Sequence, residues 1–157
     1  MTEPVLEHPN REKSESKATK AVVILLLIVA AALILIVTIG GWSQLQGAQI
    51  VSFAYALIYL VMAYYVSRWN RGVLPVAAAL AILFSVIAAV AGPAWFDRDK
   101  PGFDDPTLDP SMLGLLTLIL IPVQLLLAAF AMRGFQQQWN VEVEVQRDNP
   151  PGQVQPA

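Results

Sequence analysis

The sequence lacks cysteine, contains one histidine, and has few charged residues, which are confined to short segments. The absence of cysteine excludes disulfide bonds, thiolate metal ligands and thiol redox chemistry. Charged residues make up 14% of the chain, whereas soluble domains contain about a quarter. No Asp, Glu, Lys, Arg or His occurs in the 47 residues from Ala21 to Ser67. An uncharged stretch of this length indicates that the protein lies in a lipid bilayer.

Four apolar stretches are long enough to cross the hydrocarbon core, which takes roughly 20 helical residues. They cover residues 21–39, 47–66, 73–91 and 112–132. A helix pairs its own backbone groups, which have no water to bind in lipid, so helices are the expected elements. The short turns make consecutive helices antiparallel neighbours. We therefore predict an all-α, four-helix up-down bundle that forms one membrane domain over residues 21–132.

The segments outside the bundle are polar. Residues 1–20 and 133–157 have no apolar stripe to bury, so we expect mostly disordered tails. Val and Glu alternate over residues 141–145, a pattern that suits a strand on another protein's sheet. No second strand is predicted within this chain, so an unpaired extended tail is expected there.

The first apolar stretch is too long for the hydrophobic region of a signal peptide, so we expect an uncleaved anchor. It consists almost entirely of Val, Ile, Leu and Ala, with Thr38 as its one polar side chain. This composition favours a place at the lipid-facing periphery of the bundle, or an apolar contact with another protein.

The positive charges predict an orientation. Eight Lys and Arg residues fall on the side of the two tails and two on the other side, Arg98 and Lys100. The positive-inside rule then places both termini in the cytoplasm of a plasma membrane (N-in/C-in). The overall plan is similar to that of many small bacterial four-span membrane proteins.

Polar groups within the spans are few and uncharged. Ionisable residues mark proton and ion paths in membranes, so such activities are not expected of this chain alone. Tyr59, Ser85 and Gln124 fall near the middle of their spans and are predicted to meet on the bundle axis, close to a bend at Pro122. This cluster has two interpretations: hydrogen bonds that hold helices together, or a pocket for a ligand or water.

Small residues repeat at heptad spacing in the third span and predict a close helix contact. They are Ala78, Ala81, Ser85, Ala88 and Gly92.

The loop over residues 92–111 is the longest soluble connection, and long loops often carry function. Trp95, Phe96 and Phe103 are candidates for contact with a partner. The loop also contains several Asp residues, but a calcium loop starting at Asp97 would have Pro101 and Leu108 at ligand positions. No metal site, cofactor site or catalytic residue is predicted.

The sequence favours a non-enzymatic accessory or structural subunit, which acts through helix and loop contacts with the bilayer, other membrane subunits or itself. The alternative is a transporter or channel component for a neutral or lipophilic compound bound at the mid-membrane polar cluster. An enzyme would have to use the outer-loop carboxylates, Asp97, Asp99, Asp104 and Asp105. No basic patch suits nucleic acid.

Overall fold

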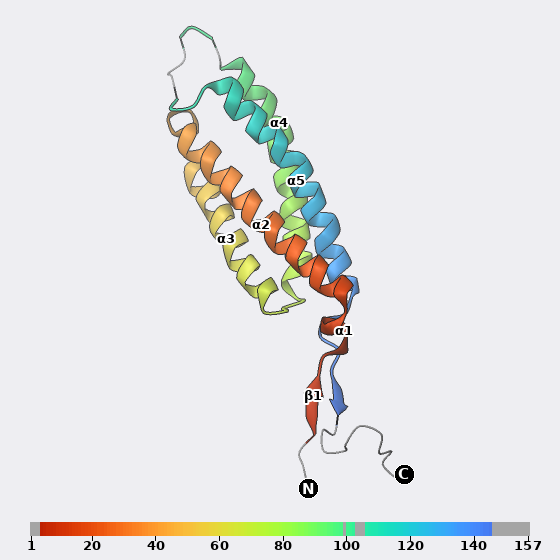
Figure 1. The fold of residues 1–157 in the computed structure, drawn as a ribbon. Helices are drawn as coiled ribbons and strands as arrows, with labels where there is room; N and C mark the ends of the chain where they lie inside the picture. The colour runs from red at the N-terminus through yellow and green to blue at the C-terminus, as the bar shows by residue number, and fades with distance from the viewer. Residues whose placement is uncertain (1–3, 99, 103–105, 146–157) are drawn as a thin grey trace, which may run out of the picture.

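The computed structural model describes residues 4–98, 100–102 and 106–145, and four long helices form most of it (Figure 1). They are α2 (Ser14–Gly40), α3 (Gln49–Ser67), α4 (Val73–Asp97) and α5 (Pro110–Gln136). Consecutive helices run in opposite directions, and all four are long and apolar enough to cross a membrane. The predicted all-α four-helix bundle is confirmed, and the chain is a multi-pass membrane protein.

The four helices form two hairpins, α2–α3 and α4–α5. The hairpins are joined mainly where α2 packs against α5, whereas α3 and α4 touch each other only sparsely. Helix α2 therefore lies between α3 and α5, as Figure 1 shows. One face of the first span packs against these neighbours, and its other face is exposed, for example at Leu25 and Ile39, so the expected lipid-facing position applies to that face. The buried side chains of α2 recur every three or four residues: Val23, Leu27, Ala30, Ile34 and Val37.

The close contact between α4 and α5 depends on small side chains. The small residues predicted to share a face in the third span are all buried: Ala78, Ala81, Ser85, Ala88 and Gly92. A Cβ atom added at Gly92 would lie 2.6 Å from Cδ2 of Leu118 on α5. The backbones of these two helices therefore approach too closely at this point for a larger residue to fit without a shift.

Three helices, α2, α4 and α5, extend well beyond the predicted spans; α5 continues past residue 132 to Gln136. Helix α4 continues through Pro93 to Asp97, and the Trp95 ring packs with Val37 and Leu113 in a small apolar cluster. This packing explains why the helix does not end at residue 91. Helix α2 begins at Ser14, so it includes part of the polar segment before the first apolar stretch.

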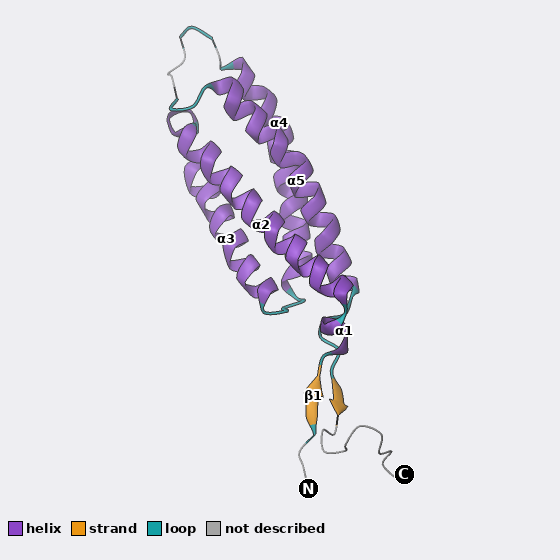
Figure 2. Ribbon diagram, viewed as in Figure 1, coloured by secondary structure: helices purple, strands orange, loops and turns teal. Residues whose placement is uncertain are grey.

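The two terminal segments pair with each other below the bundle (Figure 2). Strand β1 (Val5–Glu7) is antiparallel to β2 (Val143–Val145), with Leu6 opposite Glu144. The expectation of an unpaired tail at residues 141–145 is therefore wrong, because the partner strand comes from the polar N-terminal segment.

A short helix, α1 (Pro9–Glu12), joins β1 to the bundle and strengthens the contact between the terminal segments. Nδ2 of Asn10 donates to the carbonyl of Gln138 at 2.9 Å, and Nε of Arg11 donates to the carbonyl of Trp139 at 2.9 Å. The Trp139 ring is fully buried and meets the Trp69 ring edge-on, with centroids 5.1 Å apart. The terminal segments thus close one end of the bundle.

Candidate functional site

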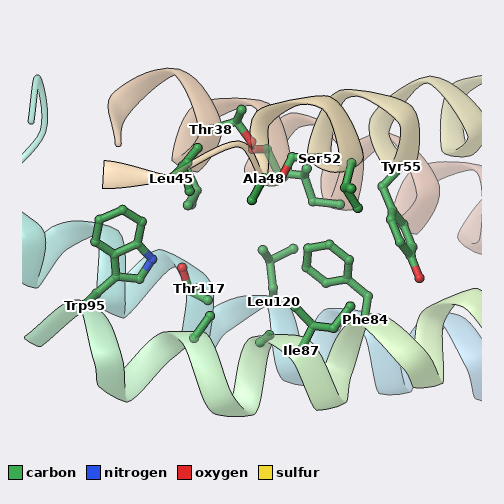
Figure 3. Close-up of a pocket in the computed structure, with 15 residues that line it drawn as sticks. Thr38, Leu45, Ala48, Ser52, Tyr55, Phe84, Ile87, Trp95, Thr117 and Leu120 are labelled. Carbon is green, nitrogen blue, oxygen red and sulfur yellow. Dashed lines mark hydrogen bonds between the residues drawn. The ribbon is translucent and has the colours of Figure 1, made fainter. Parts of the chain in front are cut away.

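An apolar cleft separates the two hairpins where α3 and α4 diverge (Figure 3). It has a volume of about 160 Å³. Val51 on α3 and Ile87 on α4 line it and are 58% and 42% exposed, so it opens to the side of the bundle. The side chains that line it come from all four helices and the α2–α3 connection, and include Ile34, Val37, Thr38, Leu45, Ala48, Ser52, Tyr55, Phe84, Ala88, Ala91, Trp95, Thr117 and Leu120.

Most hydroxyl groups around the cleft are already bonded to their own helix or a neighbour. Oγ1 of Thr38 donates to the carbonyl of Ile34 at 2.6 Å, and Oγ1 of Thr117 donates to that of Leu113 at 2.7 Å. These threonines therefore offer the cleft little hydrogen-bonding capacity. The interior suits a hydrocarbon group better than a polar ligand. An apolar cavity of about 150 Å³ is large enough for benzene.

The two ends of the cleft differ. Trp95 lies at one end in Figure 3, and Tyr55 and Phe84 lie at the other. The rings of Tyr55 and Phe84 meet edge-on with centroids 4.9 Å apart, and the Tyr55 hydroxyl donates to the carbonyl of Leu80 at 3.4 Å. These aromatic contacts hold α3 to α4 and close the end of the cleft that lies away from Trp95.

A second cavity of about 180 Å³ adjoins the Trp95 end of the cleft. It shares Leu45, Ala48, Ala91 and Trp95 with the cleft and adds polar groups from Gln44 and Arg98. The cleft and this cavity therefore share a wall: the cleft is apolar, and the adjoining cavity is bordered by the Arg98 side chain.

Two of the three predicted mid-span polar residues meet. The hydroxyl of Tyr59 donates to Oε1 of Gln124 at 2.6 Å, and neither side chain is exposed. Nε2 of Gln124 has no hydrogen-bond partner among the residues that the structure describes. The pair connects α3 to α5 inside the core and does not line the apolar cleft.

Ser85 is not part of that pair. Its Oγ atom donates to the carbonyl of Ile82 in the same helix at 2.7 Å. Pro122 lies inside α5, two residues before Gln124. The bend at Pro122 and a ligand role for the polar cluster stay predictions.

Two of the three aromatic residues proposed for contact by the outer loop belong to α4 instead. Trp95 belongs to α4 and is 4% exposed, with its ring turned into the bundle. Phe96 follows it in α4 and is 42% exposed. Phe103 lies outside the described residues, as do Asp99, Asp104 and Asp105.

A third cavity, of about 460 Å³, lies beside the terminal segments and is polar. Acidic and basic side chains both line it: Glu7, His8, Arg11, Glu12 and Lys17. The mixture of charges gives it no clear preference for either sign of ligand. Within the described ranges, no group of three or more His, Asp or Glu side chains is arranged to hold a metal ion.

Comparison with known proteins adds no relative. No protein-family model, curated protein or solved structure matches this chain.

Sequence reasoning missed the cleft and its lining, above all Tyr55, Phe84 and Trp95. These residues belong to apolar stretches whose composition does not distinguish lipid contact from protein contact. One signal was present: Arg98 and Lys100 are the two basic residues in the connection between the third and fourth spans. Their position in the sequence does not indicate, however, that Arg98 borders a cavity.

Proposed function

We propose that this protein is a non-enzymatic membrane protein that binds a lipophilic molecule in the cleft between α3 and α4. The observation that carries the proposal is the cleft itself, which is apolar and opens to the side of a bundle whose helices suit a bilayer. A non-enzymatic role is favoured because the apolar spans contain no Asp, Glu, Lys, Arg or His. The transporter alternative also required a lipophilic ligand, bound at the mid-membrane polar cluster. We propose that the ligand lies in the cleft, which the Tyr59–Gln124 pair does not line.

Energetics support occupation of the cleft. An empty cavity of about 160 Å³ would cost about 4 kcal/mol at roughly 24 cal/mol per Å³. A hydrocarbon chain that enters from the bilayer restores the lost packing contacts. The lateral opening between Val51 and Ile87 gives such a chain a route that avoids water.

A matched pair of substitutions tests the proposal. Ala91 lines the cleft, whereas Val90 is the next residue of α4 and is 72% exposed. The full chain is purified in a mild detergent, and the lipophilic molecules that it retains are counted by native mass spectrometry. Ala91→Phe fills the cleft and is expected to remove the bound molecule, whereas Val90→Phe retains it. Equal retention by both variants would contradict the proposal.

An accessory subunit is the second candidate function. The specific observation in its favour is that α3 packs closely against α2 and only sparsely against α4. A partner's helix could therefore lie along α3. A protein that co-purifies with the wild type in fixed stoichiometry and is lost in Ala91→Phe would favour this candidate over a lipophilic ligand.

For location, we propose a plasma membrane with both termini in the cytoplasm. The excess of Lys and Arg on the side of the tails supports this orientation. The pairing of β1 with β2 supports a common side for the tails. Because the chain lacks cysteine, Lys100→Cys and Asn140→Cys can each be labelled without background in intact cells. We expect an impermeant maleimide to modify Lys100→Cys only; the reverse pattern would contradict this orientation.

A further inference from the structure

Arg98 borders the second cavity, which adjoins the Trp95 end of the cleft. Its Nη1 atom donates to the carbonyl of Gln44 at 2.8 Å, and its Cζ atom lies 4.9 Å from the centroid of the Trp95 ring. It is half-buried and directly follows α4. The guanidinium group is therefore positioned between the α2–α3 connection and α4, where the apolar span ends. This is the depth at which lipid headgroups lie.

The charge of Arg98 remains available to a ligand. Among the described residues no carboxylate forms a salt bridge with Arg98. A guanidinium has five N–H donors in a planar fork that matches phosphate geometry. Only the bond to Gln44 uses one of them within the described part of the chain. As far as the described residues go, an anion at this position would therefore find several unused donors and a positive charge without a carboxylate partner.

Selectivity for a ligand has to come from the end of the cleft beside Arg98. Lipid chains are as apolar as the side chains of the cleft, so a chain that moves from the bilayer into the cleft gains no hydrophobic free energy. The apolar interior therefore accepts hydrocarbon without distinguishing one lipid from another. The charged mouth does distinguish them through their net charge. Both kinds of headgroup carry a phosphate, but in a zwitterionic headgroup the ammonium group offsets the attraction of the phosphate to a cation, whereas an anionic headgroup keeps it.

We propose that the occupant of the cleft is a membrane phospholipid with an anionic headgroup. This inference rests on the proposed function and names the class of its ligand. The phosphate binds Arg98, and part of one acyl chain lies between α3 and α4, pointing toward Tyr55 and Phe84. The volume of about 160 Å³ holds a segment about the size of benzene. The remainder of the chain stays in the bilayer through the lateral opening.

Trp95 supplies a second polar contact. Its indole nitrogen lies on the side of the ring toward Thr117 and the cleft interior in Figure 3. Among the described residues this N–H group has no hydrogen-bond acceptor. The ester carbonyl of a phospholipid lies just below its phosphate. Arg98 therefore binds the phosphate, and Trp95 binds the ester carbonyl that comes next along the lipid.

Native mass spectrometry with two probe lipids tests the proposal. The full chain is incubated in mixed micelles with equal amounts of phosphatidylglycerol and phosphatidylcholine that have identical acyl chains. One favourable basic contact corresponds to a preference of about fivefold for the anionic lipid. We expect wild type to show this preference, Arg98→Gln to lose it, and Arg98→Lys to keep most of it because the charge remains.

Lys100→Gln is the matched control. Lys100 lies at the same end of the bundle, and its side chain is 63% exposed beside Asp97, away from the cleft lining. Its replacement removes the same charge and is expected to leave the lipid preference unchanged. An equal loss of preference in Lys100→Gln and Arg98→Gln would show general surface attraction and overturn the proposal, as would an unchanged preference in Arg98→Gln.

The same experiment separates this inference from the proposed function. Ala91→Phe blocks the cleft, so it is expected to remove both lipids. If Ala91→Phe removes both lipids but Arg98→Gln changes nothing, the cleft binds lipid without headgroup selection and only the inference fails. If Ala91→Phe retains both, the proposed function fails as well. A lipid-free dimer that Ala91→Phe abolishes would identify a second copy of the chain as the occupant and overturn both.

Discussion

The buried Tyr59–Gln124 pair allows a double-mutant cycle with a distinctive outcome. The Tyr59 hydroxyl donates to Oε1 of Gln124, while Nε2 has no partner among the described residues. Interhelical hydrogen bonds in membrane proteins are worth about 0.6 kcal/mol on average and up to about 1.7 kcal/mol. A buried polar group without a partner costs about 1 to 3 kcal/mol. The bond and the unpaired amide group therefore have opposite effects of similar size on the free energy of unfolding.

The two single substitutions differ in what they leave behind. Tyr59→Phe removes the hydroxyl and leaves both polar atoms of Gln124 unpaired, so we expect a loss of about 1 kcal/mol in the free energy of unfolding. Gln124→Met removes the hydrogen bond and the unpaired Nε2 atom but leaves the buried Tyr59 hydroxyl without its acceptor. One unpaired group replaces another, so we expect a loss of no more than about 1 kcal/mol from the lost bond. The double variant leaves no polar group in this part of the core. We expect it to be at least as stable as wild type.

Unfolding by sodium dodecyl sulfate in mixed micelles, followed by far-UV circular dichroism, measures all four proteins of the cycle. Ser85→Ala is the control, because the Ser85 hydroxyl donates to a carbonyl of its own helix and to no other helix among the described residues. Its free energy of unfolding is expected to stay within about 0.5 kcal/mol of wild type. The reasoning is refuted if the losses in the two single variants simply add in the double variant, because the pair would then have no coupling.

Two further predictions concern the fold. Gly92→Ala places a Cβ atom against Leu118, so we expect a loss of about 1 to 3 kcal/mol in the same unfolding assay. Adding Leu118→Ala should partly restore stability, and no loss in the single variant would contradict the close approach of α4 and α5. In the terminal sheet, Leu6→Cys with Glu144→Cys places two thiols directly opposite each other, within disulfide reach. Oxidation should cross-link this pair much faster than Leu6→Cys with Val145→Cys, whose second thiol points to the other face, and equal rates would refute the register.

The helices of the bundle were predictable because hydropathy and length determine them in a membrane protein. The small-residue face of α4 was also predictable, because close packing needs small side chains at heptad spacing. The Tyr59–Gln124 contact followed from two polar residues at the same mid-span level, which have few alternatives to bonding each other across the bundle axis.

The position of α2 was not predictable from composition. Its buried positions recur at alternating intervals of four and three residues from Val23 to Val37, which is the pattern of a packed helix. The residues between them are equally apolar, because lipid and protein interior favour the same side chains. The sequence therefore does not show which positions of α2 are buried. The structure shows them, because α3 and α5 pack against α2 at these positions.

The terminal sheet and the cleft escaped prediction for different reasons. Three-residue strands give almost no periodic signal, and the pairing of β1 with β2 joins segments at opposite ends of the sequence. The cleft results from the divergence of α3 and α4, which depends on side-chain packing throughout the bundle. Neither feature follows from any local segment of the chain.

A structure of the full chain in lipid nanodiscs that contain phosphatidylglycerol tests the central claim most directly. The account predicts an elongated density between α3 and α4 that begins beside Arg98 and Trp95 and ends near Tyr55 and Phe84. A structure in which α3 and α4 pack against each other along their length, with no space between them, would contradict it.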